Sequence, residues 1–423
     1  MVDSVRPAAE DGDMSRAVIL FDDGGGRLSP VCDLRASFEL RTGAMTTGER
    51  LAAQLGEPIA AAFVPEALGP LVATRWAVPI NRLPEDADEL LMLNGRWPRV
   101  SADLPSEINS ALVTSDGQVI AALVDREQAM AFMASGCRDL PDAVDIEPIE
   151  DAGLIERPWH VLQVMDAGNL RDDLQWLAEH RDDLRRLDPA DHHMVAIVGD
   201  HPVYVGPNIE LHPFTAFNTL KGPIVIEPDV QINAHSVVYG PCYIGEHSVL
   251  HHRSDVGYSA IGPHCKLGGE VNVCVFQGYA NKSHSGFVGH TYIGEWSNLG
   301  ASTVSSNLKN TYGEVSMVCE PGAAAEPTGM QFLGSIIGDH VRTAIGTRLS
   351  TGSCLHTGAM LAISRSSPRC VERFAFLTDD GAGRYVFEKF ALIVDRMMIR
   401  RGRRVTAELA QRFAQLYAET TRG

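Results

Sequence analysis

The stretch Ile226–Leu267 reads IEPDVQINAHSVVYGPCYIGEHSVLHHRSDVGYSAIGPHCKL. An aliphatic residue returns every six positions along it, with a single step of five, at Ile226, Ile232, Val238, Ile244, Leu250, Val256, Ile261 and Leu267. A helix repeats its apolar residues at about 3.6 positions and a strand at about 2, so neither explains this period. A period of six is typical of a hexapeptide β-helix, in which each unit forms one flat side of a three-sided coil.

Small residues support the same interpretation. Four positions after each of the first seven aliphatic residues the chain carries Val230, Ser236, Cys242, Ser248, Ser254, Ala260 or Cys265. A narrow coil has room for only a small side chain at its second inward position. The period returns over residues 293–303 and 337–361, and it breaks at 271–290 and 311–335. Insertions in a solenoid map to external loops, which often carry function, so both breaks are expected to be such loops.

Composition excludes several classes of protein. The 423 residues carry 54 acidic and 36 basic side chains and a net charge of -18, which disfavours binding to nucleic acid or to an anionic membrane. No apolar run approaches the ~20 residues needed to span a bilayer. The eight cysteines form no CxxC pair and no zinc pattern, so reduced thiols in the cytoplasm are expected.

The N-terminal part has the pattern of an α/β domain. After an expected flexible tail, residues 1–16, the apolar run Ala17–Asp23 predicts a buried strand followed by the glycines 24–26. Such a loop lets backbone amides approach phosphates, although a plain glycine turn also explains it. Asp22 and Asp23 are candidate Mg²⁺ ligands, because hard cations prefer carboxylate oxygen. A hairpin is predicted around Asp116 and Gly117, with helices over 126–136 and 170–187.

The C-terminal part predicts two helices, 385–402 and 406–420, with Gly402 between them. Their expected role is to cover the unpaired strand edges at one end of the β-helix. A basic cluster lies at the end of the first helix. It can meet the phosphates of coenzyme A, or it can complement the helix C-terminus and solvent. Its members are Arg396, Arg400, Arg401, Arg403 and Arg404.

The coil sequence, with GHTYIGEWSNLGASTVSSNLKN (289–310), MQFLGSIIGDH (330–340) and LAISR (361–365), resembles a known family. The family is that of the bifunctional N-acetylglucosamine-1-phosphate uridyltransferase/glucosamine-1-phosphate acetyltransferases, and the match is nearer to a divergent branch of sugar nucleotidyltransferases with a short N-terminal domain. The resemblance covers residues 196–366. It implies a left-handed β-helix, a homotrimer and active sites between neighbouring prisms.

The expected fold class is therefore an α/β nucleotidyltransferase-like domain, a left-handed parallel β-helix and C-terminal helices. Five segments are expected, and they are a tail (1–16), a reduced nucleotidyltransferase-like domain (17–155), a helical linker (156–195), an acyltransferase-like β-helix (196–366) and a helical cap (367–423).

An acetyl transfer to a sugar amine needs a base with a pKa near ~6.5, which a histidine supplies. By motif position, the resemblance makes His290 the base, with His284 as the alternative. It assigns Asn298 and Asn307 to the catalytic centre, with Asn298 also contacting the sugar. The other implied sugar or sugar-phosphate contacts are Tyr292, Lys309, Lys282 and Lys266. Acetyl-CoA is expected against Ala301, Ser302 and Thr303, where the tight turn at 300–302 offers amides to an oxyanion.

The start of the chain resembles the same family. Its glycine-rich loop with an arginine corresponds to Gly24, Gly25, Gly26 and Arg27. Arg35 and Arg41, in LRASFELRTG, resemble a loop of the divergent branch, and with Asn94 they are candidates for phosphate contact.

Three functions are open at this point. The first is sugar-nucleotide synthesis by acetyl transfer from acetyl-CoA, by nucleotidyl transfer to a sugar 1-phosphate, or by both, with Mg²⁺ and with UDP-N-acetylglucosamine for the cell envelope as the product. The second is a regulatory, non-catalytic trimer that binds a sugar nucleotide. The third is nucleotidyl transfer alone, with the β-helix as a scaffold.

Overall fold

A computed structural model describes residues 16–150 and 152–420 of the chain. Apart from Arg16, the expected tail lies outside the described residues. The contacts divide the chain into two compact units. The first unit contains the described residues up to Gly24 and the range Leu51–Leu154. The second unit contains Gly25–Arg50 and the residues from Ile155 onward. The segment Gly25–Arg50 was expected in the N-terminal domain, but it packs with the β-helix instead.

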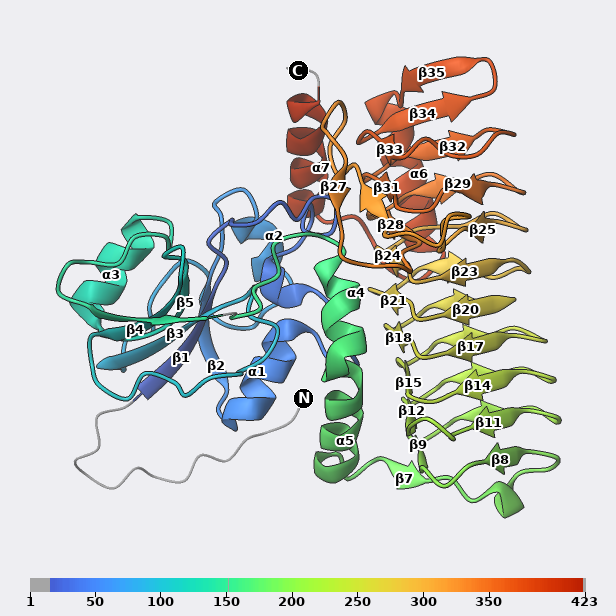
Figure 1. Cartoon of the computed structure of the whole chain (residues 1–423), viewed down its shortest axis with the longest axis horizontal. Helices are drawn as coiled ribbons and strands as arrows, with labels where there is room; N and C mark the ends of the chain where they lie inside the picture. The colour runs from blue at the N-terminus through green and yellow to red at the C-terminus, as the bar shows by residue number, and fades with distance from the viewer. Residues whose placement is uncertain (1–15, 151, 421–423) are drawn as a thin grey trace. The chain divides into compact units, whose positions relative to one another are not determined.

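The first unit is built on a sheet of order β2-β1-β3-β5-β4-β6 (Figure 1). Strands β1, β2 and β3 run parallel, and β5 is antiparallel to both β3 and β4. The predicted strand and hairpin are thus confirmed as β1 and as β4 with β5. The strands are β1 (Arg16–Phe21), β2 (Ile59–Phe63), β3 (Glu89–Asn94), β4 (Ser110–Thr114), β5 (Val119–Asp125) and β6 (Asp145–Ile149), and the helices are α2 (Gly69–Ala73) and α3 (Arg126–Ala134). Helix α1 (Thr47–Leu55) contains the boundary between the two units, which falls after Arg50.

The second unit is a three-sided parallel β-helix, as predicted, and Figure 1 shows its coils stacked one above another. The first face is ten strands, namely β7 (Arg185–Arg186), β9 (Val203–Val205), β12 (Ile224–Ile226), β15 (Cys242–Ile244), β18 (Ala260–Ile261), β21 (Val275–Phe276), β24 (Tyr292–Ile293), β28 (Ser335–Ile337), β31 (Ser353–Leu355) and β33 (Cys370–Val371). The second face is β8 (Ala196–Val198), β11 (Ala216–Asn218), β14 (Val237–Tyr239), β17 (Asp255–Gly257), β20 (Glu270–Asn272) and β23 (Phe287–Gly289), followed by the pair β25 (Val304–Ser305) and β30 (Arg348–Leu349). The third is β10 (Glu210–Leu211), β13 (Gln231–Ile232), β16 (Val249–Leu250), β19 (Lys266–Leu267) and β22 (Asn281–Lys282), continued by β29 (Arg342–Thr343), β32 (Met360–Ala362), β34 (Ala375–Thr378) and β35 (Gly381–Arg384).

The six-residue period is the inward face of these coils. All eight aliphatic residues of the period are fully buried in one core. The small residues lie beside them, and the serines among them donate hydrogen bonds to backbone carbonyls. Ser236 and Ser254, for example, each donate a hydrogen bond to the carbonyl of His251, at 3.1 and 2.5 Å. The expected fold class is confirmed, because stacked parallel strands of this kind bury the eight aliphatic residues of the period.

The break at 271–290 is not an external loop, which corrects the expectation. The segment continues the three faces as β20, β21, β22 and β23. Val271, Phe276 and Val288 occupy inward positions there. The period is hidden for two reasons. First, the steps from Leu267 to Val271 and from Val271 to Phe276 are shorter than six residues. Second, the next inward position holds Lys282 instead of an aliphatic residue, since Lys282 pairs with Leu267 between β19 and β22.

The break at 311–335 is an insertion, as predicted. It carries an antiparallel hairpin of β26 (Ser316–Met317) and β27 (Glu326–Pro327). The chain returns through Leu333, whose amide donates to the carbonyl of Asn307 at 2.9 Å, and Gly334, whose amide donates to the carbonyl of His290 at 2.8 Å. The insertion therefore ends beside the histidine that the sequence singled out.

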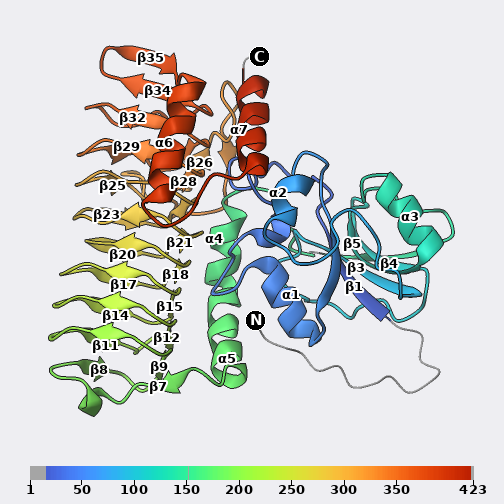
Figure 2. The ribbon, with the colours of Figure 1, turned by 180° about the vertical axis from the view of Figure 1, so that it is seen from behind.

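Helices flank the β-helix. They are α4 (His160–Val164), the π-helix η2 (Met165–Asn169), α5 (Leu170–His180), α6 (Phe387–Ile399) and α7 (Ala407–Glu419), with short 3-10 turns η1 (Ser37–Glu39) and η3 (Pro189–Asp191). The two predicted C-terminal helices are confirmed, but α6 runs alongside the last coils instead of across their end (Figures 1 and 2). Arg401 reaches back to the carbonyl of His264 at 2.9 Å. The last strand at that end is β35, paired antiparallel with β34.

The segment Gly25–Arg50 is fixed to the β-helix by a buried ion pair. Arg35 donates two hydrogen bonds to the carboxylate of Asp339, at 2.9 and 2.8 Å, and both side chains are almost fully buried. Gln277 adds a second attachment, since its Oε1 accepts from the amide of Arg41 at 3.0 Å and its Nε2 donates to the carbonyl of Glu39 at 2.8 Å.

Candidate functional sites

His290 and Asn307 come together at one corner of the β-helix. His290 follows β23 and has a left-handed backbone conformation, with φ of 48°. Its Nδ1 lies 3.0 Å from Nδ2 of Asn307, and its ring stacks on Phe332 with centroids 5.4 Å apart. Burial lowers the pKa of His290 below its usual value, and Asp166 opposes the shift only in part. The imidazole is therefore neutral near pH 7, as a general base must be.

A pocket of about 360 Å³ lies next to this corner. Asn272 connects the two, because its carbonyl accepts from the amide of His290 at 2.9 Å and its side chain lines the pocket. Oδ1 of Asn272 is buried without a hydrogen-bond partner among the described residues. Asn272 therefore links the pocket to the histidine corner through its backbone.

The walls of this pocket come from segments far apart in the chain. Met165 and Asp166 belong to η2, and such π-helical turns are frequent at functional sites. Lys221 lies over the ring of Tyr258 at 5.0 Å and places a positive charge at the pocket. Sequence reasoning missed these residues and Phe332, since only the register of the coils gathers the pocket residues and only the insertion brings Phe332 to His290.

The other predicted residues of the catalytic motif lie elsewhere. Tyr292 is on the first face, fully buried, with its hydroxyl 3.2 Å from Oε1 of Gln277. Asn298 is on the third face, where it accepts a hydrogen bond from Asn281 at 3.2 Å. The structure therefore does not bring either residue to His290, because the chain turns a corner of the prism after each short strand.

The predicted lysines are dispersed as well. Nζ of Lys282 is inside the prism and donates to the carbonyls of Gly268 and His284, at 2.6 and 2.7 Å, and burial lowers its pKa to about 8. Lys282 thus cannot reach a sugar phosphate. Lys309 donates to the carbonyl of Glu314 at 2.5 Å, and Lys266 lies on the third face. His284 is exposed before β23, at the opposite end of that strand from His290.

The turn expected to bind acetyl-CoA has the amides of Gly300, Ser302 and Thr303 in use, and that of Gly300 donates to Oγ1 of Thr343 at 3.0 Å. The amide of Ser302 donates to the carbonyl of Ser285, and the amide of Thr303 donates to the carbonyl of Gly300, both at 3.1 Å. The hydroxyl of Thr303 is buried against Thr343 at 2.9 Å, and the carbonyl of Ala301 accepts from Gly346 at 2.7 Å. These groups stabilise the stacking of the coils, so they do not form an oxyanion site in this arrangement.

The first unit has its own pocket, of about 640 Å³, at the carboxyl ends of β1 and β2. Ligands of open α/β sheets bind at this edge. Asp22, Glu66 and Arg138 line it. Asp23 lines it too, but Arg96 holds its carboxylate with two hydrogen bonds of 2.9 and 2.6 Å. Asp22 accepts from the amide of Gly24 at 2.9 Å, so it fits Mg²⁺ better than Asp23 does.

The arginines expected to bind nucleotide phosphates lie in the second unit. Arg27 pairs with Glu326 at 3.1 Å. Arg35 is held by Asp339, and Arg41 donates to the carbonyl of Ala44 and lies over the ring of Tyr243 at 5.4 Å. These are structural contacts that fix the segment Gly25–Arg50. Asn94 is fully buried and donates to Asp23 at 3.1 Å, so it too has a structural role.

The glycine loop is divided between the two units. Gly24 lies in the first unit, and its φ of +62° favours glycine. A Cβ added at Gly24 would lie 3.4 Å from the side chain of Arg138. Gly25 and Gly26 belong to the second unit, where Gly26 packs against Glu156. Of the predicted loop, Gly24 therefore stays beside the pocket of the first unit.

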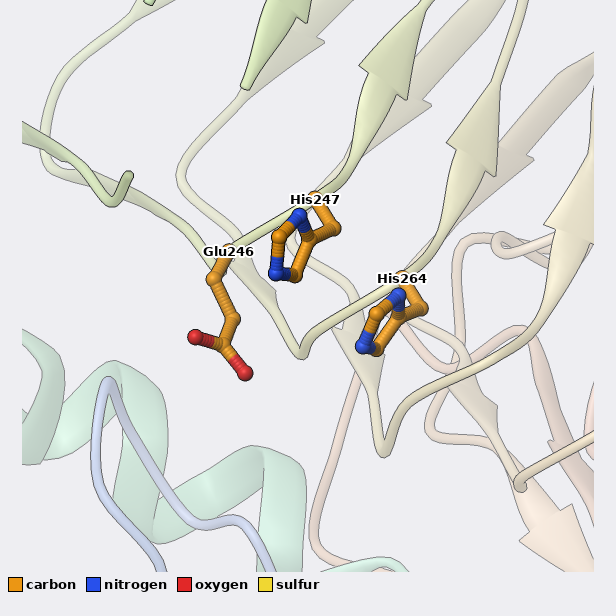
Figure 3. A group of neighbouring side chains, drawn as sticks. All are labelled: Glu246, His247 and His264. Atoms are coloured by element: carbon orange, nitrogen blue, oxygen red, sulfur yellow. The ribbon is translucent and has the colours of Figure 1, made fainter. Parts of the chain in front are cut away.

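One cluster that sequence reasoning missed has metal-ligand chemistry. Ligand atoms of Glu246, His247 and His264 lie within 4.8 Å of one another. The two imidazoles are stacked face to face, 4.7 Å apart, as Figure 3 shows. Their lone pairs lie in nearly parallel planes and do not converge on one ion. Burial, His247, Arg403 and Arg401 also lower the pKa of His264 despite Glu246, and such a positive surrounding opposes a cation. We assign the rings to an aromatic stack along this corner.

Comparison with known proteins finds a family match over the N-terminal part of the chain, which covers the first unit together with Gly25–Arg50 and the first residues after Ile155. Residues 18–182 match the sequence model of the family described as sugar nucleotidyl transferase. This match is a similarity to nucleotidyl transferases over less than half of the chain, and it supports a sugar-modifying enzyme. A comparison with curated proteins finds no match. The comparisons do not confirm the bifunctional uridyltransferase/acetyltransferase family that the sequence resembles.

Two solved structures are similar to the chain. The polysialic acid O-acetyltransferase OatWY is 12% identical, with 45% of this chain and 88% of that chain covered and a TM-score of 0.23. A GDP-perosamine N-acetyltransferase variant from Caulobacter crescentus, in complex with CoA and GDP-perosamine, is 12% identical, with 67% and 100% covered and a TM-score of 0.11. Both TM-scores are low, so the β-helix assignment rests on the strand pairing described above.

Among the described residues, none of the helices combines the length and the apolar character needed to cross a membrane.

Proposed function

We propose that the β-helix unit transfers an acetyl group from acetyl-CoA to the amine of an amino-sugar phosphate, with His290 as the general base. The observation that carries this proposal is the 3.0 Å contact of His290 with Asn307. Asn272, whose carbonyl accepts from the amide of His290, links this corner to the pocket of about 360 Å³. The sugar phosphate and the acetyl donor come from the resemblance to the sugar acetyltransferases. Lys221 and Arg171 at the pocket supply positive charge for the phosphate.

Asn307 is a positioning residue in this mechanism. The oxygen and nitrogen of an asparagine amide exchange places by a half-turn. With Oδ1 facing the ring, Nδ1–H of His290 donates to it, and Nε2 is left as the base. The amine attacks the thioester carbonyl as Nε2 takes its proton. The tetrahedral intermediate then expels the CoA thiolate, which receives that proton from the imidazolium. The products are an N-acetyl sugar phosphate and CoA thiol.

The pH profile of kcat for acetyl transfer tests the proposal. The active form is the neutral imidazole, so activity is lost as pH falls through the pKa of His290. Because burial lowers that pKa, we expect the fall in kcat to lie at lower pH than the titration of a free histidine, ~6.5, and to reach about tenfold per unit well below the pKa of His290. In Asn307→Asp, the carboxylate stabilises the imidazolium, so the acid limb shifts to higher pH. If the acid limb of the kcat profile of the unmodified protein is centred above pH 7, His290 is not the general base.

Nucleotidyl transfer at the first unit is the second candidate. It is favoured by the family match and by the pocket of about 640 Å³ at the carboxyl ends of β1 and β2. Here Asp22 and Glu66 are the residues that would hold Mg²⁺, which would neutralise phosphate charge, and Arg138 would meet the phosphates.

Release of pyrophosphate from UTP and a sugar 1-phosphate tests this activity. We expect Asp22→Asn to lower the rate by about 100-fold or more, while Asp145→Asn, on the exposed strand β6, leaves it unchanged. Equal rates in both variants contradict the site.

UDP-N-acetylglucosamine as the product and the homotrimer remain predictions. Sedimentation velocity of the full chain tests the trimer. If neither reaction occurs while a sugar nucleotide still binds, the regulatory alternative replaces both proposals.

A further inference from the structure

A second pocket of the β-helix unit, of about 460 Å³, lies between α6 and the third face. Its residues line neither of the pockets assigned to the two proposed reactions. Five of its residues are basic and none is acidic, although the chain as a whole carries a net charge of -18. We call it the basic pocket, and its cations are Lys266, Arg342, Arg396, Arg400 and Arg401.

One wall of the basic pocket is a row of residues that occupy the same place on four successive coils and pair with one another. Lys266 pairs with Asn281, Asn281 with Asn298, and Asn298 with Arg342. The two amides are already ordered, since Asn281 donates to Asn298 at 3.2 Å and accepts from Arg401 at 2.7 Å. This wall is rigid, because every strand in it is paired on both sides. The other wall is the polar end of α6, with Arg396 and Arg400.

The cations have few partners within the chain. Among the described residues, none of the five forms an ion pair with a carboxylate within 4.0 Å, whereas Arg35, Arg50 and Arg96 each do. Nη2 of Arg342 donates to the thioether of Met397 at 3.1 Å, and a thioether is a weak acceptor for a guanidinium. Burial lowers the pKa of Lys266, with Arg401 and Arg400 adding to the effect. Concentrating these charges without counter-ions costs free energy that a bound anion would recover.

We propose that the basic pocket binds a small molecule carrying at least two phosphate groups. Guanidinium groups bind phosphate oxygens in bidentate pairs, and two walls of cations match two phosphates better than one carboxylate. The volume is within the range of small-molecule sites. Ile393 and Met397 add an apolar patch to the same pocket, which suits the organic part of a nucleoside diphosphate or of coenzyme A.

This site is separate from the proposed acetyl-transfer centre. Its coil residues lie on the third face, while His290 lies at the corner between the second and first faces. Loss of one site therefore leaves the other intact, and the two proposals fail independently.

Isothermal titration of the full chain with inorganic pyrophosphate, UDP and CoA tests the inference. We expect pyrophosphate to bind, with an affinity that falls as salt rises. The double variant Arg396→Gln/Arg400→Gln, whose side chains are exposed and whose fold should persist, should weaken binding about tenfold or more. Where Arg396→Gln/Arg400→Gln weakens the binding, tighter binding of UDP than of pyrophosphate identifies a nucleotide as the ligand of the basic pocket, and tighter binding of CoA identifies the coenzyme.

The matched control is Arg403→Gln/Arg404→Gln, which removes the same charge from the same exposed segment outside the pocket. It should bind pyrophosphate as the unmodified chain does, and so should His290→Ala. The inference is overturned if pyrophosphate does not bind, if Arg396→Gln/Arg400→Gln binds it unchanged, or if the control loses affinity equally, since that would be attraction to net charge alone.

Discussion

Replacement of His290 by alanine should lower kcat for acetyl transfer to glucosamine 1-phosphate by about 100- to 10,000-fold, the contribution typical of a general base. The ring is held by Asn307 and Phe332, and burial keeps it neutral. Release of CoA thiol from acetyl-CoA measures the rate. Added imidazole should restore part of it, because the substitution leaves a space where the ring was.

Two other histidines serve as controls for this experiment. His235 also lies at a left-handed corner of the β-helix, with φ of 62°, so His235→Ala reports the effect of changing such a corner without touching the pocket. His284 is the alternative base from the sequence. Both variants should keep the rate of the unmodified protein. If His284→Ala loses activity while His290→Ala retains it, the role of base passes to His284.

Replacement of Arg35 by alanine should lower the free energy of unfolding of the β-helix unit by about 3 to 5 kcal/mol. Asp339 is fully buried, and the substitution would leave its carboxylate without the guanidinium that neutralises it. Urea unfolding followed by circular dichroism measures the change. The effect should be structural, although the sequence had suggested a phosphate contact for Arg35.

The matched control for Arg35 is Arg27→Ala. Arg27 lies on the same segment and also forms an ion pair, but its side chain is 51% exposed. Exposed pairs contribute about 1 kcal/mol or less, so this variant should be nearly neutral. The double variant Arg35→Met/Asp339→Leu should recover most of the lost stability, because it removes both buried charges. A change below about 1 kcal/mol in Arg35→Ala would show that the pair does not hold the segment.

The sequence by itself determined the β-helix, the hairpin of the first unit and the two C-terminal helices. These follow from periodic patterns of neighbouring residues, and each pattern has one regular structure that buries its apolar side. It also singled out His290 and Asn307, which lie only 17 positions apart. The period failed at 271–290 because a lysine replaces an aliphatic residue and the corners shorten, which no local rule signals.

Only the tertiary structure decided which side chains share a site. A residue's position on a three-sided coil depends on the length of every preceding corner, so Tyr292 and Asn298 lie on other faces despite their proximity to His290 in the chain. Contacts such as Arg35 with Asp339, 304 positions apart, depend on where a loop meets a distant coil. The basic pocket likewise joins four coils to one C-terminal helix. Such contacts between distant residues arise from packing across the whole unit. The sequence around either of the two contacting residues does not specify them.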